Sequence, residues 1–329
     1  MVWLYLLSAL PLALFIIFLL VMDSFKLTRW TTLVFCILAG AAMCFLSRLI
    51  CRIPELAASR LAVSAVEEIL KGLILYYLLA RHKVGLLGDT SIYGSAIGAG
   101  FALVSNAFYL AAHGEVHVAH TVFLGFESAV MHIGCTSTLA MALIMVHQGK
   151  FGDTRRAKVL GTVGAFIATI LIHYVHALEP INPIAMTVLL VIYFAISKRS
   201  LFRKNSKFVH EWVDAGIGNE VTLLSALRRG EFTGTEAGKY LLTLKENFHP
   251  ETFFDMYCYV QTYLELSIAA KSNLILKEAG MPAVHSPENL ARIEEIRALR
   301  KRMGRTGEIA LSPIVKHNDV NRWAMNNLI

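Results

Sequence analysis

Long apolar stretches dominate the first two hundred residues and place the strongest constraint on the fold. A helix needs about 20 apolar residues to cross the hydrocarbon core of a bilayer. Seven stretches come close to that length: 3–22, 31–50, 61–80, 91–112, 121–147, 157–178 and 182–197. With 56% hydrophobic and only 17% charged residues, the chain is too apolar for a water-soluble globule. We therefore predict an all-α, polytopic membrane protein with about seven transmembrane helices.

Charged residues are concentrated after the last apolar stretch. Residues 198–329 hold 19 of the 31 Lys and Arg residues and 15 of the 24 Asp and Glu residues. This shift predicts a transmembrane bundle over 1–197 and a water-facing helical domain over 198–329. Helical spacing predicts a separate core for the second domain, formed by Phe253, Phe254, Tyr257, Val260, Tyr263 and Leu264. The basic run 297–305 is more typical of a solvated helix face than of a nucleic-acid surface, so we expect no nucleic-acid partner.

Basic residues fall in every second connection between the apolar stretches, which predicts the orientation in the membrane. The cytoplasmic side retains Lys and Arg in short loops. The basic connections contain Lys26 and Arg29; Arg81 and Lys83; Lys150, Arg155, Arg156 and Lys158; and Lys198, Arg199, Arg203, Lys204 and Lys207. The pattern predicts an outside N-terminus and a cytoplasmic C-terminal domain. Arg52 and Arg60 depart from it.

The third apolar stretch contains an unexpected polar stripe in the segment SAVEEILKGLIL, residues 64–75. On a helix, Ser64, Glu67, Glu68 and Lys71 fall within an arc of about 100°. Ionisable groups at membrane depth are costly, so a functional role is the default interpretation. A structural ion pair between Glu67 and Lys71, at i,i+4, is the alternative.

Later stretches add polar side chains at similar depth. These are Asn106, His132 and the i,i+3 pair His173 and His176. At 1.5 Å of rise per residue, Glu67, Asn106, His132 and His173 lie about 8–16 Å below the predicted outer helix ends. They all occupy the outer half of the membrane, which predicts one composite polar site. Glu127 lies about 140° round the helix from His132 and is interpreted as a separate interhelical or interfacial carboxylate.

Two or three histidines with one glutamate are typical of a catalytic zinc site, and a second carboxylate is then free to move a proton. We therefore predict Zn²⁺ and peptide hydrolysis. The predicted site residues are Glu67, Glu68 and Asn106 for catalysis and His132, His173 and Glu68 for the metal, with Lys71, His176 and Ser105 as further candidates. The roles of the two glutamates stay open, with Glu67 expected nearer the metal and its water. A proton- or cation-coupled transporter and an inactive membrane scaffold are alternatives.

The motif EEILKG at 67–72 resembles the EExxK motif of the PrsW-like intramembrane metalloproteases, distant relatives of the CAAX prenyl endopeptidases. Residues 92–109 resemble that family's glycine-rich FxxxEN segment, and His132 and His173 stand where it has single histidines. The resemblance covers roughly residues 60–180. It implies cleavage of a membrane-anchored protein, such as an anti-sigma factor, in a bacterial cytoplasmic membrane. The predicted orientation puts this cleavage near the outer side. The family's Glu before Asn is Ser105 here, so that Glu is dispensable or the activity is altered.

Overall fold

The computed structural model describes residues 2–21, 23, 28–113, 117–284, 286–315, 319–326 and 328, and every regular element within these ranges is helical. The predicted all-α class is therefore confirmed. Lys26, used in the orientation argument, lies outside the described residues. The chain divides into two compact units, Met1–Asn205 and Ser206–Ile329. The predicted domain boundary at 197/198 stays a prediction.

The helices of the first unit follow the apolar stretches of the sequence. They are α1 (Val2–Val21), α2 (Trp30–Ile50), α3 (Pro54–Ala57), α4 (Arg60–Ala80), α5 (Leu87–His113), α6 (Val118–Ser128), the π-helical segment η1 (Ala129–Ile133), α7 (Gly134–His147), α8 (Arg155–Leu178) and the first part of α9 (Pro183–Arg229). Each apolar stretch is about as long as a membrane span requires. It folds as a helix because the bilayer core offers no hydrogen-bond partner to backbone groups left unpaired.

Within the described residues, five segments are long and apolar enough to cross a membrane: Trp30–Ile50, Leu87–His113, Val118–His147, Arg155–Leu178 and Pro183–Ser200. The apolar part of α1, Val2–Phe18, is shorter. Helix α4, which carries Glu67, Glu68 and Lys71, is not among the five. The chain is a multi-pass membrane protein, and the count of seven spans stays a prediction.

Glycines bring α5 into backbone contact with its neighbours. A Cβ added to Gly40 would lie 2.0 Å from the carbonyl oxygen of Ile97, and one added to Gly100 would lie 1.9 Å from that of Ile37. Helices α2 and α5 are therefore packed as closely as their backbones allow, as small residues permit in membrane bundles. On another face of α5, a Cβ on Gly98 would lie 2.5 Å from the carbonyl oxygen of His132. This contact fixes η1 against α5.

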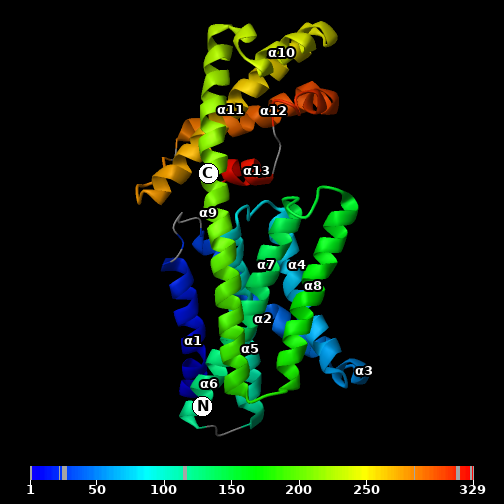
Figure 1. Ribbon diagram of the computed structural model, residues 1–329, viewed down its shortest axis with the longest axis vertical. Helices are drawn as coiled ribbons and strands as arrows, with labels where there is room; N and C mark the ends of the chain where they lie inside the picture. Colours follow the sequence, from blue (N-terminus) through cyan, green and yellow to red (C-terminus); the bar gives the residue numbers. More distant parts are fainter. Residues whose placement is uncertain are drawn as a thin grey trace. The chain divides into compact units, whose positions relative to one another are not determined.

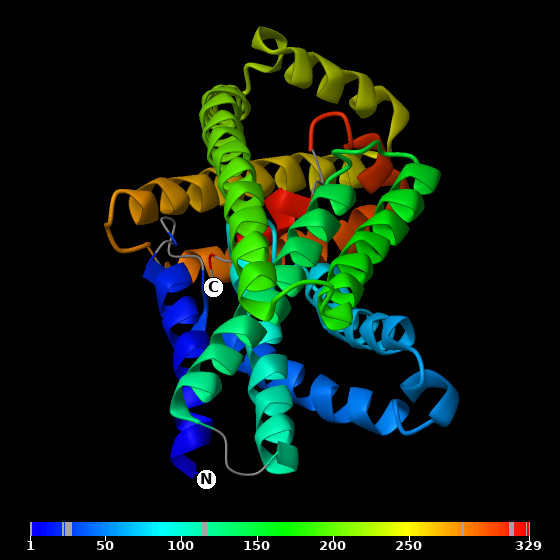
Figure 2. The ribbon, with the colours of Figure 1, turned by 60° about the horizontal axis from the view of Figure 1, so that its bottom comes forward.

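Several other helices of this unit pack against α5 or α4. Helix α6 packs against α1 and α5 near the N-terminus, as both views show (Figures 1 and 2). Helix α4 packs against α2, α7 and α8, which lie beside it in Figure 1. The polar stripe of α4 is therefore enclosed by neighbouring helices.

The second unit has its core around one long helix. It comprises α9 from residue 206, the short helix η2 (Phe232–Gly234), α10 (Glu236–Asn247), α11 (Pro250–Glu278), α12 (Pro287–Ala310) and α13 (Asp319–Asn326). Val260, Tyr263 and Leu264 of α11 are buried, as the helical spacing predicts. The prediction for Phe254 is wrong, because its side chain is 65% exposed. It points about 100° away from Phe253, which packs against the core.

Candidate metal centre

Three helical segments bring two histidines and one glutamate together. Helix α4 carries Glu67, η1 carries His132 and α8 carries His173. One ligand atom from each of these residues lies within 4.8 Å of the other two. Both histidines are buried and Glu67 is largely so. Two imidazole nitrogens and one carboxylate oxygen form a donor set that suits a tetrahedral zinc-type site with an open position.

Glu68 lies next to this cluster, and one of its carboxylate oxygens accepts two hydrogen bonds. Its Oε1 accepts a hydrogen bond of 2.6 Å from Lys71 Nζ and one of 2.9 Å from His173 Nδ1. Because His173 Nδ1 is the donor to Glu68, its Nε2 is left to act as an acceptor, and this atom lies 3.6 Å from Glu67 Oε2. A carboxylate behind a histidine in this way sets the ring orientation for metal binding. Glu68 is therefore placed to orient His173.

The position of His132 depends on its local backbone and on an aromatic neighbour. It lies in the π-helical segment Ala129–Ile133, a type of irregularity that is frequent at functional sites. Phe101 packs against it with ring centroids 4.9 Å apart, and Lys71 Nζ lies 4.9 Å from the same Phe101 ring. Lys71 Nζ also lies 3.4 Å from His132 Nδ1. The π-helical segment was not identified from the sequence, because apolar spacing gives no signal for it. Phe101 is the Phe of the segment that resembles FxxxEN, but no role was predicted for it from the sequence.

Two of the buried polar atoms that have no hydrogen-bond partner among the described residues belong to predicted site residues. They are Oε2 of Glu68 and Nδ2 of Asn106. Buried polar atoms are nearly always paired, so an unpaired acceptor or donor at a candidate site indicates room for a ligand. The free Glu68 oxygen, beside the cluster of two histidines and Glu67, fits the presence of a metal and a water.

The other predicted residues lie differently. His176 is paired with Glu127, at 3.1 Å between Nε2 and Oε1, and so belongs to a contact between α8 and α6 rather than to the cluster. Ser105 is only partly buried. Glu67, Glu68, Lys71, His132 and His173 are therefore the predicted residues that direct contacts bring together, with Glu67 rather than Glu68 in the three-residue cluster.

Comparison with known families agrees with this geometry. The protein-family model described as PrsW family intramembrane metalloprotease matches residues 21–198, which is more than half of the chain and includes every residue of the cluster. Comparison with curated proteins found no match, and neither did comparison with solved structures. With membrane-spanning helices around a cluster of metal-ligating side chains, the chain belongs to the PrsW family of intramembrane metalloproteases.

Proposed function

We propose that this protein hydrolyses a peptide bond of a membrane-anchored protein, using a zinc ion held by Glu67, His132 and His173. The observation that carries the proposal is the approach of these three ligand atoms to within 4.8 Å of one another inside a family of metalloproteases. When bound, zinc supplies Lewis-acid polarisation of the scissile carbonyl and activates water. The remaining steps depend on side chains of the chain itself.

Glu68 is the proposed proton carrier. Its Oε2 has no partner among the described residues, whereas Oε1 is held by Lys71 and His173. The free oxygen accepts a proton from the attacking water and returns it to the leaving amine nitrogen, so that water and peptide become a carboxylic acid and an amine. The Lys71 ammonium balances the buried negative charge before the reaction. Asn106, with its free Nδ2, is the proposed donor to a substrate carbonyl.

We place cleavage in the outer half of a bacterial cytoplasmic membrane, with the second unit in the cytoplasm. The alternation of basic connections supports this orientation, and the calculated depths of Glu67, His132 and His173 support the position of the site. An anti-sigma-factor-like membrane protein is the proposed type of substrate, supported by the family resemblance.

The metal content of the purified protein tests the proposed ligands. We expect about one zinc per wild-type chain and at least a tenfold lower zinc content in His132→Ala and His173→Ala. His176→Gln is the matched control, because His176 lies one helical turn from His173 but pairs with Glu127. The proposed site would be contradicted if His132→Ala held as much zinc as wild type, or if all three variants lost the same amount of zinc. Either result would favour a transporter as the function of these polar groups.

Proteolysis is tested separately by comparing new protein N-termini in membranes from cells that express wild type or Glu68→Gln. We expect cleavage products that depend on Glu68 and map near the outer ends of substrate helices. If zinc binds but no cleavage depends on Glu68, the chain is a metal-binding scaffold. The Ser105→Glu variant, which restores the family's usual residue, then shows whether that position limits the activity.

A further inference from the structure

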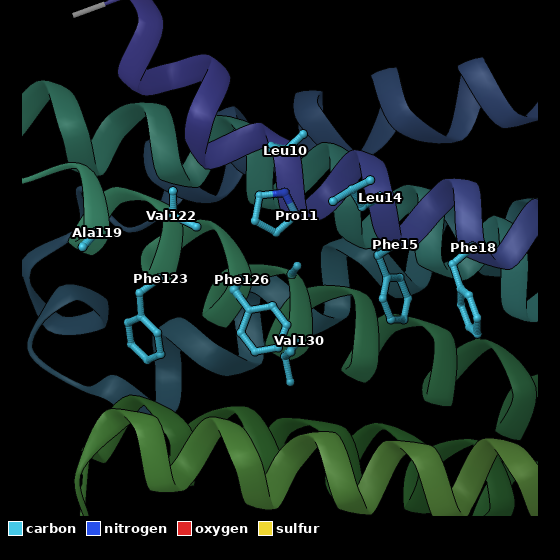
Figure 3. A pocket seen from close by; sticks show the side chains of 11 residues that line it. Leu10, Pro11, Leu14, Phe15, Phe18, Ala119, Val122, Phe123, Phe126 and Val130 are labelled. Carbon is cyan, nitrogen blue, oxygen red and sulfur yellow. The ribbon is translucent and has the colours of Figure 1, made fainter.

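A groove on the first unit lies apart from the metal cluster and is lined by apolar side chains. It has a volume of about 620 Å³ and runs between α1 and the α6–η1 segment. Its lining residues include Leu10, Leu14, Phe15 and Phe18 of α1 and Ala129 and Val130 of η1. Figure 3 shows Phe15 and Phe18 at one end of the groove and Ala119 and Phe123 at the other. Such a surface suits a hydrocarbon chain.

A buried cation lies next to the end of the groove that contains Phe15. Lys198 of α9 is 9% exposed, and its Nζ has no hydrogen-bond partner among the described residues. This ammonium lies 5.1 Å from the ring centroid of Phe15. Lys71, which is also buried in this unit, has a carboxylate partner in Glu68. An ammonium removed from water without a counter-ion is costly, so Lys198 is suited to an anion.

The depth of Lys198 in the membrane matches that of a phospholipid headgroup, and the depth of the groove matches that of an acyl chain. The apolar stretch 182–197 ends directly before Lys198, so Lys198 lies at the membrane edge, where lipid phosphates are found. The groove follows α1 from Leu10 to Phe18, which is about 12 Å along the helix axis. A lipid with its headgroup at Lys198 therefore directs an acyl chain past Phe15 into the groove.

We propose that this groove binds one acyl chain of an anionic phospholipid whose phosphate pairs with Lys198. A substrate transmembrane helix is the less suitable occupant, because an apolar helix leaves the ammonium without an anion.

The proposed lipid contacts the segment that carries His132. Ala129 and Val130 line the groove, and both belong to the π-helical segment Ala129–Ile133. The same segment packs on α9, where Val130 and Met131 share an apolar cluster with Phe194. A bound acyl chain thus fills the side of η1 that faces α1 and α6, and it stabilises the backbone that positions His132.

Lipid binding to the full-length, delipidated protein in detergent tests the proposal by native mass spectrometry. Phosphatidylglycerol and phosphatidylcholine with identical acyl chains serve as probes, and glycerol phosphate serves as the chain-free control. We expect wild type to bind one phosphatidylglycerol about tenfold more tightly than phosphatidylcholine, a difference of about 1.4 kcal/mol. Lys198→Met should remove this preference, whereas Arg199→Met, the neighbouring exposed position, should change it less than twofold.

The groove is tested by a filling variant. Leu14→Trp should reduce the binding of both lipids at least tenfold, and Leu6→Trp is its control, because Leu6 is similarly exposed on α1 but does not line the groove. Equal effects of Lys198→Met and Arg199→Met overturn the proposal, as does tight binding of glycerol phosphate alone. Displacement of the lipid by an apolar transmembrane peptide would assign the groove to a substrate helix instead. If Leu14→Trp fails to fold, the comparison at Lys198 still decides the outcome. These measurements require no proteolysis, so they are independent of the proposed function.

Discussion

At the scale of single residues, the two adjacent glutamates have different surroundings. Glu67 belongs to the three-residue cluster and its side chain is 16% exposed, whereas Glu68 is fully buried between Lys71 and His173. Removing one partner of a buried ion pair is costly, about 3–5 kcal/mol, because the other charge is left uncompensated. Glu68 and Lys71 therefore act as a unit that also holds the ring of His173.

Substitution of the two glutamates should separate these roles. In Glu67→Gln we expect the zinc content of the purified protein to fall at least tenfold, because an amide oxygen is a poor replacement for a carboxylate ligand. In Glu68→Gln we expect zinc to remain at saturating concentration but with an affinity about 10–100-fold lower, as for residues that orient a ligand. Zinc titration of both variants provides the measurement. Weaker binding in Glu68→Gln than in Glu67→Gln would reverse the proposed roles.

At the scale of helices, the site depends on how closely α5 approaches η1. Gly98 faces the backbone of His132 and Ile133, where a Cβ would lie 2.5 Å from the His132 carbonyl oxygen. Phe101, one turn further along α5, packs on the His132 ring. A shift of α5 therefore moves the backbone and the ring packing of the same histidine. Packed helices respond to such intrusions by displacement, since close-packed interiors leave little free space.

Gly98→Ala should thus damage both stability and metal binding. We expect a loss of about 1–3 kcal/mol in the free energy of unfolding, as is usual for overpacking, together with weaker zinc binding. Gly164→Ala is the control, because no atom lies within 4 Å of a Cβ at that position of α8. The control should be neutral or stabilising by up to about 1 kcal/mol, since Ala is the better helix former. Unchanged zinc affinity in Gly98→Ala would show that η1 tolerates movement of α5.

At the scale of the whole molecule, the two compact units have separate cores. The core of the first unit is formed by side chains of α1, α2, α4, α5, η1 and α7, and that of the second by side chains of α9, α10, α11 and α12 and by residues that follow α12. Every residue of the metal cluster precedes residue 180. Among the described residues, the groups that hold the cluster in place all belong to the first unit.

Truncation after Lys204 tests this separation. We expect the shortened protein to insert and to retain about one zinc per chain, because the ligands and their supporting contacts all lie in the first unit. Regulation or substrate choice is expected to change. Correct insertion with loss of zinc would instead make the second unit part of the structure that maintains the site.

The second unit contains a carboxylate whose contribution to stability depends on pH. Burial raises the pKa of Glu265, but the hydrogen bond from Arg228 Nη2, at 2.7 Å, and the charge of Arg292 lower this pKa below its ordinary value. Since the pKa is lower in the folded than in the unfolded state, this contribution is present at neutral pH. It is lost as the pH falls through the folded-state pKa.

Glu265→Gln should therefore be less stable than wild type at pH 7, by up to about 1 kcal/mol, and should match it in acid. Hydrogen–deuterium exchange of α11 peptides in the full-length protein measures the difference. Glu231→Gln is the control, because the bridge from Glu231 to Arg229 is largely exposed. A difference between Glu265→Gln and wild type that persists below the folded-state pKa would exclude this explanation.

Much of this protein follows from local patterns in its sequence. Apolar stretches of membrane length predict the helical class, since a backbone in lipid must satisfy its own hydrogen bonds. Ionisable residues within those stretches point to the site, because each is costly alone at that depth. Periods of 3.6 residues also predict most of the buried face of α11, although Phe254 shows that a neighbour 100° away is easily included in error.

Other features depend on contacts between residues far apart in the chain, and only the tertiary structure decides them. Sequence spacing does not decide between Glu67 and Glu68, because their side chains point about 100° apart and the packing of α4 against α7 and α8 sets which one faces the histidines. The same holds for the pairing of His176 with Glu127 and for the place of Lys198 above Phe15. Each joins two helices, and helix rotation and approach depend on every side chain at their interface.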